Sequence, residues 1–420
     1  MVGTARSART ARTARTARTA RRTTAGASGT ARGRPGNGVR SAPSTAAAVS
    51  RLVAVALPSG DEFVRTLRRI WDDGDAVLPV DLRLPAPARA RLLSALRPDR
   101  IVDSSGTTRL ADPVPALDGD ALVLATSGTT GVPKGVVLTH DAVRASAAAT
   151  SERLAVDPAN HHWLACLPLA HVGGLSVVCR ALHTGTRLTV HPAFDPDAAQ
   201  SCGATHVSLV PTALGRIDPS RFTRIVLGGA APPTDLPPNV VCTYGMTETG
   251  SGIVYDGVPL AGVGVRAVDG ELQVRGPMLL RAYRDGSTPE GVDPTVDGWL
   301  ATGDAGTVDA TGTVQVFGRS GDVVVTGAQK VWPDPVEAVL ARVPGVAEVA
   351  VIGRADPEWG AVVTAVVVPA DPARPPTLAD LQAAVRAELA PYCVPRRVEL
   401  VDALPRTALG KVQRGRLREA

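Results

Sequence analysis

The sequence predicts an α/β fold with a large N-terminal domain of mainly parallel sheets and helices, a small β-rich subdomain, and a small, mobile α+β C-terminal domain. From about residue 49, apolar strand-like runs alternate with amphipathic stretches, which is typical of parallel sheets covered by helices. Short runs broken by Asp-Gly and Thr-Gly turns follow, and these turns favour antiparallel strands. The expected parts are a disordered tail (1–48), an N-terminal domain (49–319, with the β-rich part at 257–317) and a C-terminal lid domain (320–420).

The elements of the N-terminal part follow one another as strand and helix. The first, "SRLVAVALPSGDEFVRTLRRIWDDG" (50–74), predicts a strand and then an amphipathic helix. A second strand, "ALVLATSGTTG" (121–131), runs into a Gly/Thr loop. Three further segments predict strands followed by helical or loop residues: "HHWLACLPLAHVGGLSVVCRAL" (161–182), "THVSLVPTALGRI" (205–217) and "RIVLGGAAPP" (224–233).

The C-terminal part begins after a polar turn, "GRSGD" (318–322), and repeats these patterns on a smaller scale. Strands are expected in "VAEVAVIG" (346–353) and "AVVTAVVVP" (361–369). Helices are expected in "DPVEAVLARV" (334–343) and "TLADLQAAVRAEL" (377–389). Gly321 in the turn permits a wide range of backbone angles, so rotation there is feasible, although the sequence does not fix a pivot residue.

The arginine-rich N-terminus differs in composition from the rest of the chain. Residues 1–50 hold ten arginines and no acidic residue, and "ARTARTARTARTARR" repeats every three residues. With so few apolar side chains, this segment cannot repay the entropy of ordering. We interpret it as a disordered or mis-started extension, with a polyanion-binding arm and an organellar transit peptide as open alternatives. The remainder holds 35 basic and 40 acidic residues, a balance that disfavours a nucleic-acid-binding body.

Cysteine usage and hydropathy set further limits. The five cysteines are scattered without a CxxC pair, so the sequence indicates neither a zinc site nor a disulfide framework, and a reducing, cytoplasmic setting is expected. No apolar run of about 18 residues occurs, so we expect no integral membrane association. Oligomeric state is not predicted.

A Gly/Thr/Ser-rich loop, "TSGTTGVPKG" (126–135), follows the second strand. Small residues with hydroxyl and backbone donors suit close approach to phosphate oxygens, and Lys134 adds a compact positive charge. A P-loop requires Ser or Thr directly after its lysine, whereas Gly135 follows Lys134. The loop therefore predicts a phosphate site of another type.

Five motifs in order resemble those of the adenylate-forming superfamily, which includes acyl-CoA synthetases and adenylation domains. The resemblance covers about residues 120–414. Its motifs are "TSGTTGVPKG" (126–135), "TYGMTETG" (243–250), "GWLATGDAG" (298–306), "GRSGDVVVTGAQKVWPDPVE" (318–337) and "PRTALGKVQR" (405–414). It implies that ATP activates a carboxylic acid as an acyl-adenylate and that a thiol then displaces AMP, with ATP, Mg²⁺ and coenzyme A as cofactors or co-substrates.

The resemblance also implies roles for individual residues. Lys411 would bridge the attacking carboxylate and the α-phosphate, Thr247 would contact that phosphate, and Glu248 would bind Mg²⁺, a hard cation that prefers oxygen ligands. Asp304 would accept both ribose hydroxyls beside Arg319. The remaining ATP- or AMP-binding residues implied are Thr126, Ser127, Gly128, Thr129, Thr130, Gly131, Lys134, Gly229, Ala230, Tyr244, Gly245 and Met246.

Lysine usage is itself informative, because only three of the 45 basic residues are lysines. Two of them, Lys134 and Lys411, fall in the lysine motifs of the superfamily. If composition favours Arg wherever it is tolerated, the surviving lysines mark sites that need a point charge on a flexible stem. Lys330 lies in the segment that, by the resemblance, enters the active site for the thiol step, so we predict that it contacts a phosphate of coenzyme A or AMP; the alternative is a solvent-facing lysine. Gly327 and Ala328 are expected in the same CoA site.

The expected acyl side is similar to that of o-succinylbenzoate–CoA ligases of menaquinone synthesis, on "LPLAHVGGLS" (167–176) and "THVSLVPT" (205–212) followed by "LGR". That substrate has an aromatic carboxylate beside the activated one, and a buried anion needs a partner. The resemblance implies Arg216 as this partner, with a helix-surface arginine as the alternative. His171, Gly174 and Gly228 would line the acyl site, although a lone histidine is often structural.

Three other functions stay open from the sequence. The chain could be another aryl- or acyl-CoA ligase, an adenylation enzyme that loads a carrier protein, or a non-catalytic binding protein with an arginine-rich tail. The presence of Lys134, Glu248, Asp304 and Lys411 argues against the last of these. The small-molecule partners expected are a carboxylic acid, ATP and CoA, with no nucleic acid.

Overall fold

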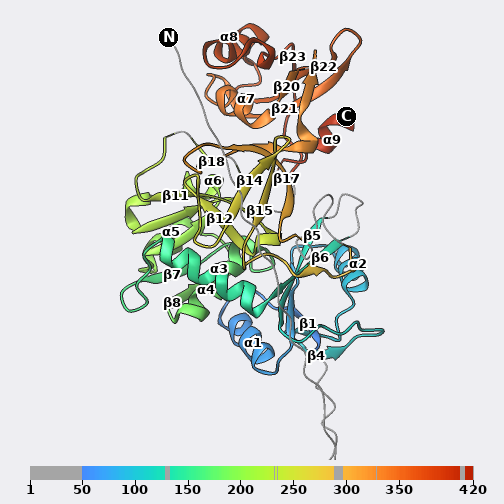
Figure 1. Cartoon of the computed structure of the whole chain (residues 1–420). Coiled ribbons are helices and arrows are strands. Elements are labelled where there is room, and N and C mark those ends of the chain that lie inside the picture. Colours follow the sequence, from blue (N-terminus) through green and yellow to red (C-terminus); the bar gives the residue numbers. More distant parts are fainter. Residues whose placement is uncertain are drawn as a thin grey trace, which may run out of the picture. The chain divides into compact units, whose positions relative to one another are not determined.

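The computed structural model describes residues 50–127, 133–230, 232–233, 235–287, 297–327, 329–406 and 412–419. The arginine-rich tail lies outside these residues. So do most of the predicted phosphate-loop tip (128–131), Ala328 and Lys411. The fold is mixed α/β, with a large N-terminal domain and a small C-terminal one (Figure 1).

The first of two seven-stranded sheets has the strand order β16-β6-β5-β2-β1-β3-β4. Its central pairs β1–β2, β1–β3 and β2–β5 are parallel, whereas its outer pairs are antiparallel. The strands are β1 (Leu52–Ala56), β2 (Ala76–Pro79), β3 (Arg100–Asp103), β4 (Gly106–Arg109), β5 (Asp120–Ser127), β6 (Pro133–Thr139) and β16 (Ala282–Tyr283). Parallel pairing therefore occupies the centre, where continuous apolar strands can be buried on both faces.

The second sheet has the order β13-β12-β11-β10-β9-β7-β8 and again keeps parallel pairs between β11 and β8. Its strands are β7 (His162–Ala165), β8 (Arg187–Val190), β9 (His206–Leu209), β10 (Arg224–Leu227), β11 (Val240–Met246), β12 (Ser251–Tyr255) and β13 (Val258–Pro259). The strands predicted in the "HHWLA", "THVSL" and "RIVL" segments are confirmed as β7, β9 and β10.

Helices α3 (His140–Arg153) and α4 (Val172–Thr184) pack against each other and contact both sheets. One hydrophobic core joins the two sheets through these helices, with Leu124, Leu138, Leu175 and Tyr255 among its buried members. The helix predicted after the first strand is α1 (Asp61–Asp72), whose Phe63, Leu67 and Ile70 face the core. The other helices of this part are α2 (Ala86–Leu96), α5 (Pro196–Ser201), α6 (Pro211–Leu214) and the 3₁₀ turns η1 (Pro219–Arg221) and η2 (Thr247–Thr249).

The β-rich segment forms an antiparallel sheet of order β14-β15-β17-β18, as its turn signals predict. Its strands are β14 (Gly264–Val268), β15 (Glu271–Arg275), β17 (Leu300–Val308) and β18 (Val314–Arg319), and the 3₁₀ turn η3 (Ser320–Asp322) follows. The register of β17 and β18 sets Asp304 opposite Arg319. Two polar residues far apart in sequence thereby become neighbours.

The C-terminal part has its own core, built from Val336, Leu340, Val351, Val363 and Leu381 with their neighbours. Its sheet has the order β21-β22-β23, beside a separate β19–β20 hairpin. The elements are β19 (Val324–Thr326), β20 (Gln329–Val331), α7 (Pro333–Leu340), β21 (Val346–Asp356), β22 (Gly360–Pro369), α8 (Leu378–Glu388), η4 (Pro391–Cys393), β23 (Arg397–Leu400) and α9 (Arg414–Glu419). All four elements predicted for this part are confirmed.

The structure also bears on membrane crossing and on the state of the cysteines. Among the described residues, no helix combines the length and the apolar character that a membrane crossing requires. All five cysteines are free thiols, and burial raises the pKa of Cys166 and Cys179 to about 12, so neither ionises at neutral pH.

Candidate active site

A cavity of about 470 Å³ lies where the ends of the parallel strands of the second sheet meet the start of α4. Ligand sites in open α/β sheets form at such strand ends. Eight residues singled out in the sequence line this cavity: His171, Gly174, Gly228, Gly229, Ala230, Gly245, Met246 and Thr247. The structure therefore brings together residues from three sequence-distant motifs.

Glycine is required where α4 begins. A Cβ atom added to Gly174 would lie 2.4 Å from the carbonyl oxygen of Leu167 and 2.5 Å from that of Pro168. Any side chain at residue 174 would push the "LPLAH" loop away from the helix. His171 is the residue that immediately precedes this helix, so its place in the cavity wall depends on that close packing.

His171 meets a carboxylate from the first sheet. Its Nε2 lies 3.1 Å from Oδ2 of Asp81 and 3.1 Å from Nη2 of Arg83. Burial raises the pKa of Asp81, but the hydrogen bonds and charge of Arg83 outweigh burial and lower that pKa to about 2. Burial lowers the pKa of His171 despite Asp81. At neutral pH the pair is thus a carboxylate beside a mainly neutral imidazole.

The most deeply buried charge on the cavity wall is Arg180 of α4, which is 2% exposed. Its guanidinium lies 4.6 Å from the ring of Trp163, and its Nη2 donates to the hydroxyl of Ser251 over 3.3 Å. Nε and Nη1 have no hydrogen-bond partner among the described residues, and none of the ion pairs found there involves Arg180. Burial lowers its pKa, yet a guanidinium stays charged in proteins.

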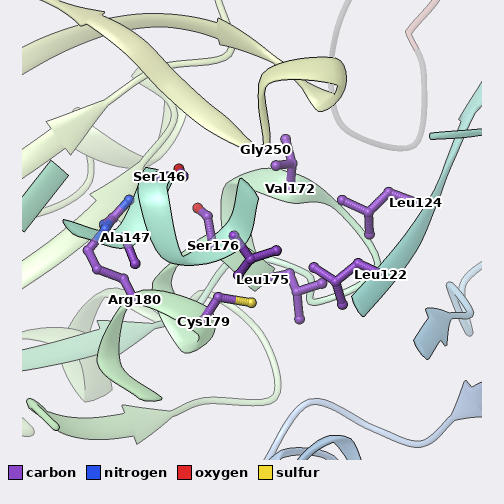
Figure 2. Close-up of a pocket in the computed structure, with 11 residues that line it drawn as sticks. Leu122, Leu124, Ser146, Ala147, Val172, Leu175, Ser176, Cys179, Arg180 and Gly250 are labelled. Carbon is purple, nitrogen blue, oxygen red and sulfur yellow. The ribbon is translucent and has the colours of Figure 1, made fainter. Parts of the chain in front are cut away.

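A second, much smaller cavity of about 10 Å³ adjoins Arg180, and Figure 2 shows the side chains that line it. Ser146 of α3 and Ser176 of α4 face this space together with apolar residues such as Leu175. Its volume is that of about one water molecule. Arg180, Ser176, Leu124 and Val172 line both cavities, so the buried cation stands between them.

The residues expected at the ribose, Asp304 and Arg319, lie in the β-rich sheet and form a compact cluster with Tyr244 of β11. The hydroxyl of Tyr244 donates to Oδ2 of Asp304 over 2.8 Å, and Nε of Arg319 lies 3.0 Å from Oδ1. Asp304 is 7% exposed, so few carboxylate orientations are open to it. Burial and the charge of Asp304 raise the pKa of Tyr244, which keeps its hydroxyl protonated as a donor. This arrangement presents a fixed acceptor to a ligand with paired hydroxyls.

Glu248 lies in η2, where its Oε1 accepts a hydrogen bond of 2.9 Å from the hydroxyl of Tyr283. No cluster of three or more His, Cys, Asp or Glu side chains suited to a metal occurs among the described residues. Mg²⁺, however, is commonly held by one or two carboxylates together with substrate phosphates. A single oriented carboxylate beside a phosphate loop fits a metal that arrives with a nucleotide.

The remaining predicted residues are placed as follows. Thr126 is the penultimate residue of β5, and its hydroxyl donates weakly to the carbonyl of Lys134 over 3.5 Å. Ser127 pairs with Pro133 through the backbone. Gly327 and Lys330 belong to the β19–β20 hairpin, with Lys330 exposed. The expectations for Gly128, Thr129, Thr130, Gly131, Ala328 and Lys411 concern positions outside the described residues.

Arg216 is not brought to the cavity. It is exposed, and its guanidinium lies 5.3 Å from the ring of Phe194. The short helix α6 turns Ala213 and Leu214 into the core, which leaves the two residues after them on the surface. Arg216 is therefore a surface arginine in this structure, as in the alternative interpretation of the sequence.

Three residues at the site escaped the sequence analysis: Asp81, Arg180 and Tyr283. Arg180 carried a usable signal, because it is the one charged residue in the apolar helix segment "VGGLSVVCRAL" (172–182). Asp81 and Tyr283 carried none, since acidic and aromatic residues after strands are common. Their roles depend on contacts with residues 90 and 35 positions away.

Comparisons with known proteins show the family to which the chain is similar. Residues 104–284 match the family of AMP-binding enzymes, and residues 335–411 match the AMP-binding enzyme C-terminal domain. A probable 2-succinylbenzoate–CoA ligase of Mycobacterium tuberculosis is 36% identical over 378 residues, which span 80% of this chain and 97% of the relative. The 2-succinylbenzoate–CoA ligase of Bacillus cytotoxicus is 36% identical over 71% of this chain and 69% of its own.

Solved structures show the same likeness. The o-succinylbenzoate CoA synthetase of Bacillus subtilis, in complex with its acyl-adenylate intermediate, superposes with a TM-score of 0.76 at 27% identity over 88% of both chains. ATP-bound MatB from Rhodopseudomonas palustris gives a TM-score of 0.76 at 25% identity, again over 88% of both chains. The chain therefore belongs to the adenylate-forming family of AMP-binding enzymes, with 2-succinylbenzoate–CoA ligases among its relatives.

Proposed function

We propose that this chain is an acid–thiol ligase that activates o-succinylbenzoate with ATP and transfers the acyl group to coenzyme A. In the first step, the succinyl carboxylate attacks the α-phosphorus of ATP and pyrophosphate leaves. In the second step, the CoA sulfur attacks the carbonyl carbon of the mixed anhydride, loses its proton and expels AMP. The relatives named 2-succinylbenzoate–CoA ligase support this choice of acid.

The observation that carries the proposal is Arg180, a buried cation on the cavity wall with two nitrogens that have no hydrogen-bond partner in the described part of the chain. An unpaired charge in a protein interior costs several kcal/mol, so a fold keeps one only where something repays the cost. An acid with one carboxylate would place that group at the α-phosphate and leave Arg180 unpaired. The second, aromatic carboxylate of o-succinylbenzoate supplies a counter-charge and hydrogen-bond acceptors for this guanidinium.

The nucleotide is assigned to the polar clusters beside this cavity. Asp304 accepts hydrogen bonds from the ribose hydroxyls, with Tyr244 and Arg319 holding its carboxylate. Gly229, Ala230, Gly245 and Met246 form the wall for the adenine and the acyl group. Thr126, Ser127, Lys134, Thr247 and residues 128–131 are assigned to the phosphates. Catalysis of this step is then mainly positioning and charge stabilisation.

Two further ligands belong to this proposal. Glu248 would hold Mg²⁺, whose positive charge offsets that of the polyphosphate. Coenzyme A would approach along the β19–β20 turn, where Gly327 has a φ of 52° and an added Cβ would lie 2.7 Å from the Trp359 ring. Lys330 remains our candidate for a phosphate contact and Lys411 for the adenylation lysine. The five free thiols fit a reducing compartment, and we assign the reaction to the cytoplasm.

The test compares two acids and two arginines by ATP–pyrophosphate exchange. The acids are o-succinylbenzoate and 4-oxo-4-phenylbutanoate, which lacks only the aromatic carboxylate. Arg180→Met should lower kcat/KM for o-succinylbenzoate by about 100-fold or more, because a buried carboxylate is left unpaired. The same variant should use the monocarboxylic analogue at least as well as the unmodified protein does.

Arg216→Gln is the matched control, and it should change the preference between the two acids by less than about twofold, since exposed charges contribute little. Thermal unfolding and Arg180→Lys, which keeps the charge, separate a substrate effect from misfolding. Equal losses with both acids in Arg180→Met would remove the assigned contact. Exchange without release of a CoA thioester would instead favour an enzyme that loads a carrier protein.

A further inference from the structure

Tyr283 links two charged residues of the phosphate side, although no sequence motif marked it. Its hydroxyl donates to Oε1 of Glu248 over 2.9 Å. Its ring lies beneath the ammonium of Lys134, with Nζ 5.0 Å from the ring centroid. One side chain therefore contacts an acidic residue of η2 and the lysine at the end of the phosphate loop.

Backbone hydrogen bonds fix the strand that carries Tyr283. The amide of Leu280 donates to the carbonyl of Glu248 over 2.7 Å, and the amide of Arg284 donates to that of Gly135 over 2.7 Å. β16 pairs with β6 so that Tyr283 lies opposite Val136. The segment is thus bonded to both elements whose charged side chains Tyr283 touches. Its position follows from the fold and does not depend on a loop.

The chemistry of a phenol suits a place between an acid and a base. A carboxylate free to turn would be drawn to the nearby ammonium, and the resulting ion pair would compete with metal and phosphate for both groups. A hydroxyl donor instead orients the carboxylate and leaves its negative charge intact. The aromatic face attracts the ammonium through its quadrupole without neutralising it. A phenol is ordinarily protonated at neutral pH, so it can act as this donor.

We propose that Tyr283 is a positioning residue for adenylation, whose hydroxyl aims the Glu248 carboxylate at the metal of the metal–ATP complex while its ring holds the Lys134 ammonium beside the polyphosphate. This inference rests on the proposed ATP-dependent function. The two roles are separable, because Tyr283→Phe removes only the hydroxyl and Tyr283→Leu removes the ring as well.

The experiment measures metal and nucleotide binding without turnover. Free Mn²⁺ is followed by electron paramagnetic resonance while it is added to the full chain with α,β-methylene-ATP, and the affinity for the metal-free nucleotide is measured by calorimetry. Tyr283→Phe should weaken Mn²⁺ binding to the protein–nucleotide complex by about tenfold, the worth of one hydrogen bond to a charged group, and leave metal-free nucleotide affinity unchanged. Tyr283→Leu should show the same loss of Mn²⁺ binding. In addition, its affinity for the metal-free nucleotide should fall by about threefold, which corresponds to one exposed cation–π contact.

Tyr392→Phe is the control, because Tyr392 is 45% exposed and lies in η4 of the C-terminal part; neither affinity should change. A Tyr283→Phe variant that binds Mn²⁺ as tightly as the unmodified chain overturns the inference while the proposed function stands. If the unmodified chain binds no metal–nucleotide complex, the proposed function fails first. The comparison of Phe with Tyr decides the role of the hydroxyl even if the Leu variant does not fold.

Discussion

The two sides of the proposed site, one for the nucleotide and one for the acid, differ in how their buried polar groups are paired. On the nucleotide side the acidic residues have protein partners: Asp304 is held by Tyr244 and Arg319, and Glu248 by Tyr283. On the acyl side, Arg180 keeps two nitrogens without a partner among the described residues. We therefore expect the groups proposed to bind the common co-substrate to be oriented in advance, and the cation proposed for the acid to gain its counter-charge only when the acid binds.

The contrast predicts that the nucleotide and the acid are recognised in different ways. An oriented carboxylate such as Asp304 costs little reorganisation when a nucleotide binds, and it cannot distinguish one acid from another. A buried, partly unpaired guanidinium favours ligands that bring an anion and penalises those that do not, because the charge then stays uncompensated. Acid specificity is therefore expected to be governed by α4, and nucleotide affinity by the β-rich sheet.

The largest effect should follow from Asp304→Ala. Two hydrogen bonds from ribose hydroxyls to a charged group are lost, so kcat/KM for ATP should fall by about 100-fold or more. The loss should be equal with o-succinylbenzoate and with 4-oxo-4-phenylbutanoate, in contrast to Arg180→Met. Pyrophosphate exchange at varied ATP measures it; a loss confined to one acid would break the comparison between the two sides.

The second prediction is a loss of folding stability at low pH, caused by a histidine close to Arg180. The ring of His206 packs at a tilt against Trp163, which also contacts Arg180. Burial, followed by the charges of His161 and Arg180, lowers the pKa of His206 from 6.5 to about 4. The unfolded chain therefore takes up this proton more readily than the folded one. The contribution of neutral His206 to the free energy of unfolding is fully present above pH 6.5. It is lost as the pH falls towards 4, and the total loss is about 3 kcal/mol.

Urea unfolding at pH 7.5, 5.5 and 4 should show this loss in the unmodified chain and a flatter profile in His206→Asn. Arg180→Met should raise the pKa of His206, because a nearby positive charge is removed. An unchanged profile in His206→Asn would assign the acid sensitivity to the other histidines whose pKa is lowered, among them His162 and His183.

The smallest effect is expected for Lys330→Ala. The side chain is exposed in β20, and one exposed charge contact changes an affinity by no more than about fivefold. The KM for CoA should rise within that limit while pyrophosphate exchange is unchanged, and Lys330→Arg should restore part of the loss. A KM for CoA that does not respond would leave Lys330 as a solvent-facing residue.

Much of the fold could be predicted because local patterns carried it. The apolar run of β1 followed by the amphipathic α1, and the Asp-Gly turns of the β-rich sheet, are signals complete within a few residues. Sheet order was not available in this way, because pairs such as β5–β2 and β16–β6 join segments far apart in the chain. The antiparallel outer pairs of the large sheets were likewise not read from the sequence.

The candidate site likewise has features that local motifs predicted and features that depend on tertiary contacts. The sequence alone determined that the chain is an adenylate-forming enzyme, because the five motifs keep their order and their residue types suit phosphate, ribose and metal chemistry. The tertiary structure decided which cation faces the acyl cavity: α6 leaves Arg216 on the surface, whereas α4 turns Arg180 inward. It also decided what Tyr283 touches. Burial and pairing arise from elements brought together by folding, and no local pattern encodes the far partner of a side chain.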